Sequence, residues 1–220
     1  MLETFNKVYT FIANDPEQFL SAIQDHILLL VLVPVSLAIL VAVPLGILAS
    51  RFRWLEKIVL SITSILQTIP SLALLALMIV LGMGIGPRPA ITALFLYSLL
   101  PILRNTFIGI KNVDPFLKEA ATGMGMTNMQ RLRMVELPIA FSVIMAGIRT
   151  ATVICIGTGT LAAYVGAGGL GVFIVRGLQL FRNYLLLVGA VPAAILALLA
   201  DYLLGKLEYF LIPRGLRGEQ

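Results

Sequence analysis

Residues 119–138 read "EAATGMGMTNMQRLRMVELP" and separate two long apolar runs of the chain. Five charged residues lie in this stretch or directly before it: Lys118, Glu119, Arg131, Arg133 and Glu136. Charges are rare in the hydrocarbon region of a membrane, so the stretch is expected to lie outside it. It therefore divides two membrane-embedded parts of the chain.

The beginning of this segment carries the signals of a short helix. Asp114 can cap the free N–H groups of a helix that begins at Pro115, since proline favours the first helical position. The letters "PFLKEAAT" then make two helical turns. Gly123 and Gly125 are expected to end the helix, because glycine adopts the left-handed conformation of a C-terminal cap.

A second short helix is predicted to follow the glycines. Thr127 and Gln130 have the spacing of a capping box, and "NMQRLRMVE" continues from there. Leu137 is expected to end this helix, because the residue before a proline is disfavoured in the helical region. Pro138 is then expected to start the next membrane span. Residues 111–138 are thus predicted to form a helix, a glycine turn and a helix.

The segment contains more apolar side chains than a solvated loop: Phe116, Leu117, Met124, Met126, Met129, Leu132 and Met134. Methionine is flexible and is common at surfaces that bind other proteins. The composition favours a surface that fits a groove on a protein partner. An amphipathic loop against lipid headgroups is the alternative that these residues leave open.

The composition of the whole chain is that of an integral membrane protein. Of its 220 residues, 59% are hydrophobic and 12% are charged, whereas soluble domains contain about a quarter of charged residues. The single cysteine, Cys155, excludes an intramolecular disulfide and is expected to be buried. The single histidine, His26, is expected at the membrane interface. No cluster of potential ligands has the spacing of a metal site.

Five membrane spans are predicted, since a spanning helix needs about 20 apolar residues. They are expected at residues 27–50, 58–83, 89–110, 138–165 and 183–212. The stretch "GGLGVFIVRGLQLF" adds a short or re-entrant sixth helix as an alternative. Prolines within the spans predict kinks at Pro34, Pro44, Pro70, Pro101 and Pro192. The expected fold class is an all-α integral membrane protein.

Lysine and arginine residues predict the orientation in the membrane. With 111–138 in the cytoplasm, eleven of them lie on that side: Arg51, Arg53, Lys57, Arg104, Lys111, Lys118, Arg131, Arg133, Lys206, Arg214 and Arg217. Four lie outside: Lys7, Arg88, Arg176 and Arg182. The N-terminus is therefore expected outside and the C-terminus in the cytoplasm. Basic residues beside an anionic leaflet also account for the net charge of +5 without nucleic acid as a partner.

Three regions follow from this arrangement. Residues 1–26 are expected to form an extracytoplasmic tail or a helix on the membrane surface, and they lack the apolar stretch of a signal peptide. Residues 27–212 are expected to form the transmembrane domain, with its cytoplasmic loop at 111–138. Residues 213–220 are expected to be a cytoplasmic tail.

The segment resembles the EAA motif of ABC importer permeases: Glu-Ala-Ala, three residues, glycine, nine residues, isoleucine, one residue and Leu-Pro. The matching residues are Glu119, Ala120, Ala121, Gly125, Val135, Leu137 and Pro138, with valine for isoleucine as the one departure. Seven positions at fixed spacing are a specific signal, and the resemblance extends over about residues 27–212. It implies the type I importer fold, with a five-helix core, in the bacterial cytoplasmic membrane.

The resemblance also implies how the chain acts. In this family the first short helix docks in a cleft of a separate ATPase subunit. The residue that matches Glu119 makes polar contacts there, the alanine pair allows close approach, and the glycine that matches Gly125 forms the turn. Closure of two ATPase subunits on ATP then drives alternating access. The chain has no P-loop, so it is expected to be non-catalytic and without a cofactor, with ATP and Mg²⁺ held by the partner.

Residues 66–110 and 144–171 resemble the permeases of bacterial osmoprotectant importers, which take up glycine betaine, carnitine, choline and related quaternary ammonium solutes. This resemblance implies three partners: a pair of ATPase subunits, a second permease in a homodimer or heterodimer, and an extracytoplasmic substrate-binding protein. A type I importer of another solute, such as methionine, is the alternative within the family. A secondary transporter is the alternative outside it, although only Arg149, Asp201 and Lys206 provide charges within the spans.

The letters "QTIPS" place three polar side chains around one proline and are candidates for a pathway lining: Gln67, Thr68 and Ser71. The site is either a packing bend or a break that lines a passage, as in many transporters. Phe95, Tyr97 and Tyr164 are candidates for transient cation–π contacts with the solute. Core or lipid-facing aromatic residues are the alternative for each.

Arg149 is a charge within a predicted span, where charges are functional or paired. On a regular helix it would share a face with Thr152, Thr160 and Tyr164, which would then line the pathway. An ion pair with Asp201 of the last span is the alternative.

The letters "GAGGLG" at 166–171 satisfy the dinucleotide-binding fingerprint, but they follow a membrane helix and lack the acidic residue that the fingerprint requires. Gly168 and Gly169 are instead expected to form a flexible bend or gate hinge at the outer end of the fourth span.

Overall fold

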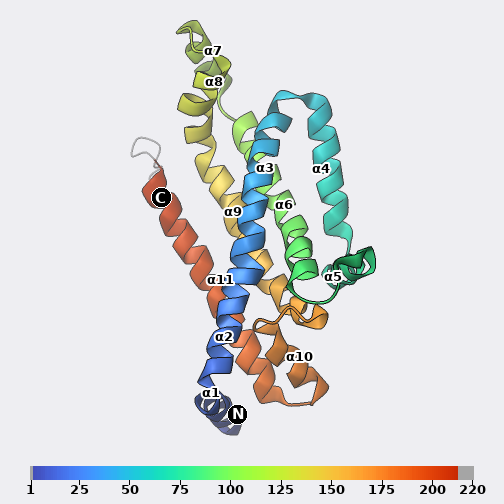
Figure 1. The fold of residues 1–220 in the computed structure, drawn as a ribbon. Coiled ribbons are helices and arrows are strands. Elements are labelled where there is room, and N and C mark those ends of the chain that lie inside the picture. The colour runs from blue at the N-terminus through green and yellow to red at the C-terminus, as the bar shows by residue number, and fades with distance from the viewer. Residues whose placement is uncertain (1, 213–220) are drawn as a thin grey trace.

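The computed structural model describes residues 2–212, and every regular element in that range is a helix. The expected tail at 213–220 lies outside the described residues, together with Arg214 and Arg217. Figure 1 shows an elongated bundle in which α3 (Val33–Arg51), α6 (Pro87–Lys111) and α9 (Leu137–Gly159) run side by side. The last helix, α11 (Asn183–Leu211), packs along α9.

The other elements extend or connect these four helices. In chain order they are α1 (Leu2–Asn14), α2 (Pro16–Ile27), η1 (Leu28–Leu32), α4 (Arg53–Thr68), α5 (Ser71–Met78), η2 (Ile79–Met83), α7 (Pro115–Gly123), α8 (Asn128–Arg131), η3 (Leu132–Glu136), η4 (Thr160–Val165) and α10 (Gly171–Gln179).

The described residues contain four continuous helical stretches that are long and apolar enough to cross a membrane: Pro16–Arg51, Pro87–Lys111, Asn128–Val165 and Asn183–Leu211. A fifth span is present if α4 and the α5–η2 stretch, which meet at a bend of 100°, count as one. The expected sixth helix is α10, whose nine residues are too short to cross a bilayer at about 1.5 Å per residue.

The first membrane helix begins before the predicted position. α2 starts at Pro16, where the side chain of Asp15 accepts a hydrogen bond of 3.1 Å from the N–H of Gln18, and it continues through η1 into α3. α1 packs beside this end of the bundle, and its Phe11 ring lies 5.7 Å from the Phe173 ring of α10, measured between centroids. Residues 2–14 are therefore a packed helix.

Two of the membrane helices contain a π-helical turn two residues before a proline. η1 precedes Pro34, and η3 precedes Pro138. In the second case the N–H of Leu137 donates to the carbonyl of Leu132, five residues back. The wider turn gives the proline ring room, so the helix continues. The prediction that Leu137 ends the second short helix is therefore wrong: the helix runs without a break from Asn128 into α9.

The three central helices approach closely because small residues line their contacts. A Cβ atom at Gly46 of α3 would lie 2.7 Å from the Cβ of Thr106 on α6. A Cβ atom at Gly147 of α9 would lie 2.6 Å from the Cβ of Asn105, also on α6. Membrane helices associate through such close packing. α6 is thus held between α3 and α9, and the segment that follows it starts from a fixed point.

Candidate functional site

The segment between α6 and α9 projects from the bundle at the end opposite α1 and α10 (Figure 1). Its first helix, α7, has the predicted cap, since the Asp114 side chain accepts a 2.9 Å hydrogen bond from the N–H of Phe116 and Pro115 follows as the first helical residue. Of the two glycines expected to end α7, Gly125 makes the turn with a φ of 79°, whereas Gly123 is the last helical residue.

The second helix begins with the predicted capping box. The N–H of Gln130 donates to the Thr127 hydroxyl at 3.3 Å, and the N–H of Thr127 donates to the Gln130 side chain at 2.8 Å. The two bonds satisfy N–H groups that a helix N-terminus leaves free. Local sequence signals therefore predict both helix starts in this segment.

The motif residues divide between the outer part of the segment and its base. Those of α7 and the glycine turn are exposed except for one alanine: Glu119, Ala120 and Gly125 are exposed, and Ala121 is buried. The others lie half-buried where the segment continues into α9: Val135, Leu137 and Pro138. The exposed part is therefore the part available to a partner.

Apolar side chains extend this exposed surface. Phe116 is 79% exposed, and four others are also exposed: Leu117, Met124, Met129 and Met134. A soluble protein surface rarely gathers so many large apolar side chains without a binding function. The surface has the character expected for contact with another protein, with a carboxylate, Glu119, beside it.

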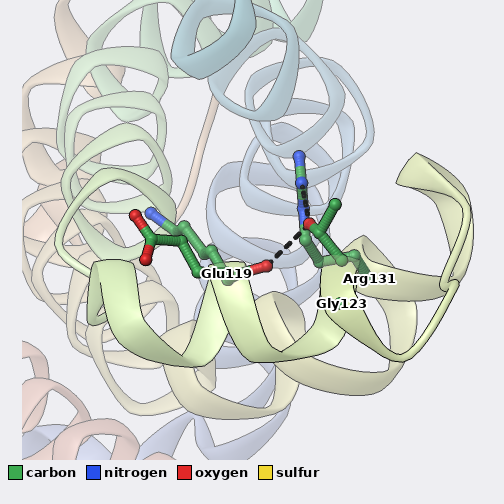
Figure 2. Close-up of a pocket in the computed structure, with 5 residues that line it drawn as sticks. Glu119, Gly123 and Arg131 are labelled. Atoms are coloured by element: carbon green, nitrogen blue, oxygen red, sulfur yellow. Dashed lines mark hydrogen bonds between the residues drawn. The ribbon is translucent and has the colours of Figure 1, made fainter.

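Polar side chains attach α7 to the bundle. The ammonium group of Lys118 donates to the carbonyls of Ile110 and Lys111, at 3.1 and 3.2 Å, and so caps the C-terminus of α6. A pocket of about 320 Å³ lies beside α7, lined by Lys118, Glu119, Thr122, Gly123 and Arg131. Figure 2 shows Glu119 and Arg131 at its two ends, with Gly123 near Arg131. One guanidinium nitrogen of Arg131 donates to the Thr122 hydroxyl at 3.0 Å.

The base of the segment contains a buried carboxylate that the sequence alone does not reveal. Glu136, on η3, is fully buried. It accepts a 3.0 Å hydrogen bond from Nε of Arg131 and a second one from Arg51, the last residue of α3. The signals that could have indicated this site are the position of Glu136 directly before the Leu-Pro of the motif and the arginine five residues earlier.

The "QTIPS" stretch is a break in the helix, with α4 on one side and α5 on the other. The side-chain amide of Gln67 donates to the carbonyl of Tyr97 at 3.1 Å, and the Tyr97 hydroxyl donates to the carbonyl of Ile69. The Tyr97 hydroxyl thus satisfies the Ile69 carbonyl at the break, and Gln67 satisfies the Tyr97 carbonyl, which has no helical partner because Pro101 lacks an N–H, as a membrane environment requires. Thr68 is exposed and Ser71 is half-buried at the same break. Their pathway role stays a prediction.

Arg149 forms the ion pair that was the alternative to a pathway lining. One of its guanidinium nitrogens lies 2.9 Å from a carboxylate oxygen of Asp201 on α11, and another lies 3.4 Å from Glu208. Arg149 and Asp201 line a groove of about 470 Å³, whereas Thr152 lines another, of about 430 Å³, between α3, α9 and α11. The two candidates therefore face different grooves.

The face that Arg149 would share on a regular helix does not persist to the end of the span. α9 ends at Gly159, and Thr160–Val165 is a 3₁₀ helix with a different number of residues per turn. Thr160 is half-buried there, and Tyr164 is exposed. Whether these two residues line the pathway stays a prediction.

Gly168 and Gly169 form the expected bend, with φ values of 79° and 74°. A Cβ atom at Gly169 would lie 3.0 Å from Nδ1 of His26. His26 is fully buried within the bundle, with Nε2 3.1 Å from the carbonyl oxygen of Ile156, and its position at the membrane interface stays a prediction. Its ring is enclosed because the glycine bend leaves room for it. Cys155 is buried, as expected, and its thiol donates to the carbonyl of Leu30.

The sequence matches, over residues 42–214, the family described as the binding-protein-dependent transport system inner membrane component. The carnitine transport permease protein OpuCB of Listeria monocytogenes is 51% identical over 210 residues, which cover 96% of this chain and 95% of the relative. The glycine betaine/carnitine/choline transport system permease protein OpuCB of Bacillus subtilis is 46% identical over 213 residues, or 97% of each chain. The osmoprotectant import permease protein OsmW of Salmonella typhimurium is 46% identical over 207 residues, or 92% of this chain and 96% of the relative.

Solved structures share the fold at lower identity. An inward-facing conformation of the MetNI methionine ABC transporter aligns with a TM-score of 0.75 and 22% identity, over 90% of this chain and 97% of that chain. An amino acid ABC transporter crystallised with histidines aligns with a TM-score of 0.72 and 20% identity, over 92% and 98%. The chain therefore has the fold of type I ABC importer permeases.

Proposed function

The chain belongs to the family of binding-protein-dependent transport system inner membrane components, and we propose that it is the permease subunit of an ATP-driven osmoprotectant importer. The observation that carries the proposal is the identity of 46% to 51%, over nearly the whole chain, with permeases named for carnitine, glycine betaine and choline. The likeness to the methionine transporter is one of fold, at 22% identity, so a quaternary ammonium solute is favoured over methionine.

The segment around α7 is the proposed docking site of the ATPase. Its outer surface combines the carboxylate of Glu119 with exposed apolar side chains such as Phe116 and Met124, which suits a partly apolar cleft on a partner. α8 continues through η3 into α9, so a push on this segment acts on one continuous helix, Asn128–Val165. Closure of two ATPase subunits would therefore move a membrane helix directly.

The proposed orientation places this segment in the cytoplasm. Figure 1 shows it at the same end as the turn between α3 and α4, with α1 and α10 at the other end. The basic residues Arg51, Arg53 and Lys57 at the α3–α4 turn support a cytoplasmic position for that end. The substrate-binding protein would then approach the α1 and α10 end. A second permease subunit would complete the pathway across the membrane.

In this arrangement the chain does not hydrolyse ATP. Its contribution is mechanical: it provides the helices that open alternately to either side, while ATP and Mg²⁺ bind to the ATPase subunits. Affinity for the solute would reside largely in the extracytoplasmic binding protein. The break at Gln67 and the bend at Gly168 and Gly169 are the proposed positions at which the helices rearrange.

Uptake by the reconstituted complex tests the proposal. The permease, its ATPase, the second permease and the binding protein are placed in liposomes, and uptake of radiolabelled glycine betaine, carnitine, choline and methionine is measured with ATP or a non-hydrolysable analogue. We expect ATP-dependent uptake of at least one quaternary ammonium solute and none of methionine. Methionine uptake would contradict the proposed substrate class, and uptake by the permease alone would contradict the ATP-driven mechanism.

A further inference from the structure

Four side chains form a continuous series of polar contacts from α7 to the end of α3. The Thr122 hydroxyl on α7 accepts from Arg131 at 3.0 Å, and Nε of Arg131 donates to Glu136 at 3.0 Å. The other carboxylate oxygen of Glu136 accepts from Arg51, which ends α3. The series thus joins the exposed segment to a membrane helix that is 85 residues away in sequence from Glu136.

Burial makes the geometry of this series specific. Glu136 has no exposed surface, and an isolated buried carboxylate is strongly unfavourable, so both arginines are required as partners. The arginine side chains are themselves only 31% and 21% exposed, which limits screening by water and salt. A displacement that separated Glu136 from either arginine would leave the buried carboxylate with only one of its two partners. The contacts therefore resist relative movement of the elements that they join.

The contact between Arg131 and Thr122 lies at the pocket beside α7. The pocket of about 320 Å³ is lined on one side by α7, from Lys118 to Gly123, and on the other by Arg131 of α8. Figure 2 shows the hydrogen bond between Arg131 and Thr122 of α7 as a dashed line. The position of α7 relative to α8 thus depends on this bond as well as on the glycine turn.

We propose that Glu136 is a positioning residue that carries the displacement of α7 to α3, in parallel with the continuous helix into α9. Through Arg131 and Arg51, one carboxylate couples the docking segment to two membrane helices, so that both move together when the ATPase closes. This inference rests on the proposed role of α7 as the docking helix. It concerns the efficiency of coupling and requires no particular solute.

The first test measures solute uptake for each ATP hydrolysed. In the reconstituted complex, Glu136→Gln keeps the shape of the side chain but weakens both ionic contacts. We expect ATP hydrolysis within about twofold of the wild type and a fall in uptake per ATP of about tenfold, a size typical of coupling between sites. Thr122→Val removes the outer hydrogen bond, together with the bond that the Thr122 hydroxyl donates to the Lys118 carbonyl within α7, and leaves both contacts of Glu136 in place, so a smaller loss, of about two- to fivefold, is expected. Arg133→Gln, at an exposed position on the same helical turn, is the control and should match the wild type.

The second test measures the coupled movement without any solute. Spin labels are attached at Phe52, in the turn after α3, and at Gly123, the last residue of α7, where a Cβ atom would meet no neighbour within 4 Å, in a chain whose native Cys155 is replaced by alanine, with the ATPase bound. In the wild type, the distance distribution between the labels should stay narrow on addition of ATP. In Glu136→Gln it should broaden.

The two measurements separate this inference from the proposed function. If the wild-type complex takes up no osmoprotectant, the proposed function fails, and the label distances still decide the role of Glu136. Unchanged distances and unchanged uptake per ATP in Glu136→Gln would overturn the inference. If that variant does not insert into the membrane, Thr122→Val decides in its place: broadened distances support the coupling role, and wild-type distances contradict it.

Discussion

Arg149 of α9 and Asp201 of α11 form an ion pair in the membrane-embedded part of the bundle, with 2.9 Å between a guanidinium nitrogen and a carboxylate oxygen. Glu208, further along α11, approaches the same guanidinium at 3.4 Å. The pair joins the last membrane helix to α9, the helix that continues from α8 and η3. A guanidinium shared by two carboxylates fixes the register of the two helices as well as their contact.

Neutralising one partner of this pair should weaken the attachment of α11. Asp201→Asn and Arg149→Gln are each expected to lower the melting temperature in detergent. Exchanging the charges, with Arg149→Asp and Asp201→Arg together, should restore stability only in part, because the carboxylate at position 149 then faces Glu208. Adding Glu208→Gln should complete the recovery. Exchanged variants that are no more stable than the single ones would show that the pair does not join the helices.

The glycine turn after α7 should tolerate alanine at one position and not at the other. Gly125 has a φ of 79°, where a residue with a Cβ atom is less stable by about 1–2 kcal/mol. Gly123 lies in helical conformation, and a Cβ atom at either glycine would meet no atom within 4 Å. Gly125→Ala should therefore weaken ATPase binding, measured by pull-down, while Gly123→Ala should not. Equal binding by the two variants would contradict the role of the turn.

Close packing between α6 and α9 should make Gly147 intolerant of any side chain. A Cβ atom there would lie 2.6 Å from Asn105 and 2.8 Å from the carbonyl of Pro101, so Gly147→Ala should destabilise the bundle by about 1–3 kcal/mol. Gly157, on the same helix, has no neighbour within 4 Å of a Cβ atom, and Gly157→Ala is the matched control. Thermal unfolding in detergent measures both. The close packing would be disproved by a melting temperature of Gly147→Ala equal to that of the control.

Cys155 provides a reporter for these stability measurements. It is the one cysteine of the chain and is 1% exposed, with its thiol bonded to the carbonyl of Leu30. A maleimide should label the folded protein slowly and the unfolded protein at once, since burial excludes the reagent. Mass spectrometry after a short pulse at each temperature measures the labelled fraction. Rapid labelling of the folded protein would contradict the packing of α9 against η1.

The features of residues 111–138 that depend on neighbouring residues in the chain are predictable from sequence. Asp114 with Pro115, and Thr127 with Gln130, act within one helical turn, so their spacing alone predicts the caps. The course of the chain at Pro138 is not predictable in the same way. Whether the helix ends or continues at Pro138 depends on whether a π-helical turn forms before the proline.

The burial of charged and polar side chains could not be predicted from the sequence. In the sequence, Glu136 is one of several charges in a polar segment. Its burial is not evident there, because its partner Arg51 lies 85 residues earlier in the chain. The burial of His26 is not evident from the sequence, because the space for its ring is made by the distant Gly159 and Gly169. Both cases depend on contacts between distant segments. For Arg149, the sequence allowed both a pathway role and an ion pair with Asp201. The ion pair became evident only from the distance between the two side chains in the structure.

The most direct test of the central claim, that an ATPase docks on α7, is the affinity of the ATPase subunit for Glu119→Ala. Loss of one polar contact of about 1.4 kcal/mol corresponds to a tenfold change in the dissociation constant. Glu17→Ala, an exposed carboxylate on α2 at the other end of the bundle, is the matched control. We predict that Glu119→Ala binds the ATPase about tenfold more weakly than the wild type while Glu17→Ala binds it normally. Wild-type affinity in Glu119→Ala, in a chain that is correctly inserted, would contradict docking through α7.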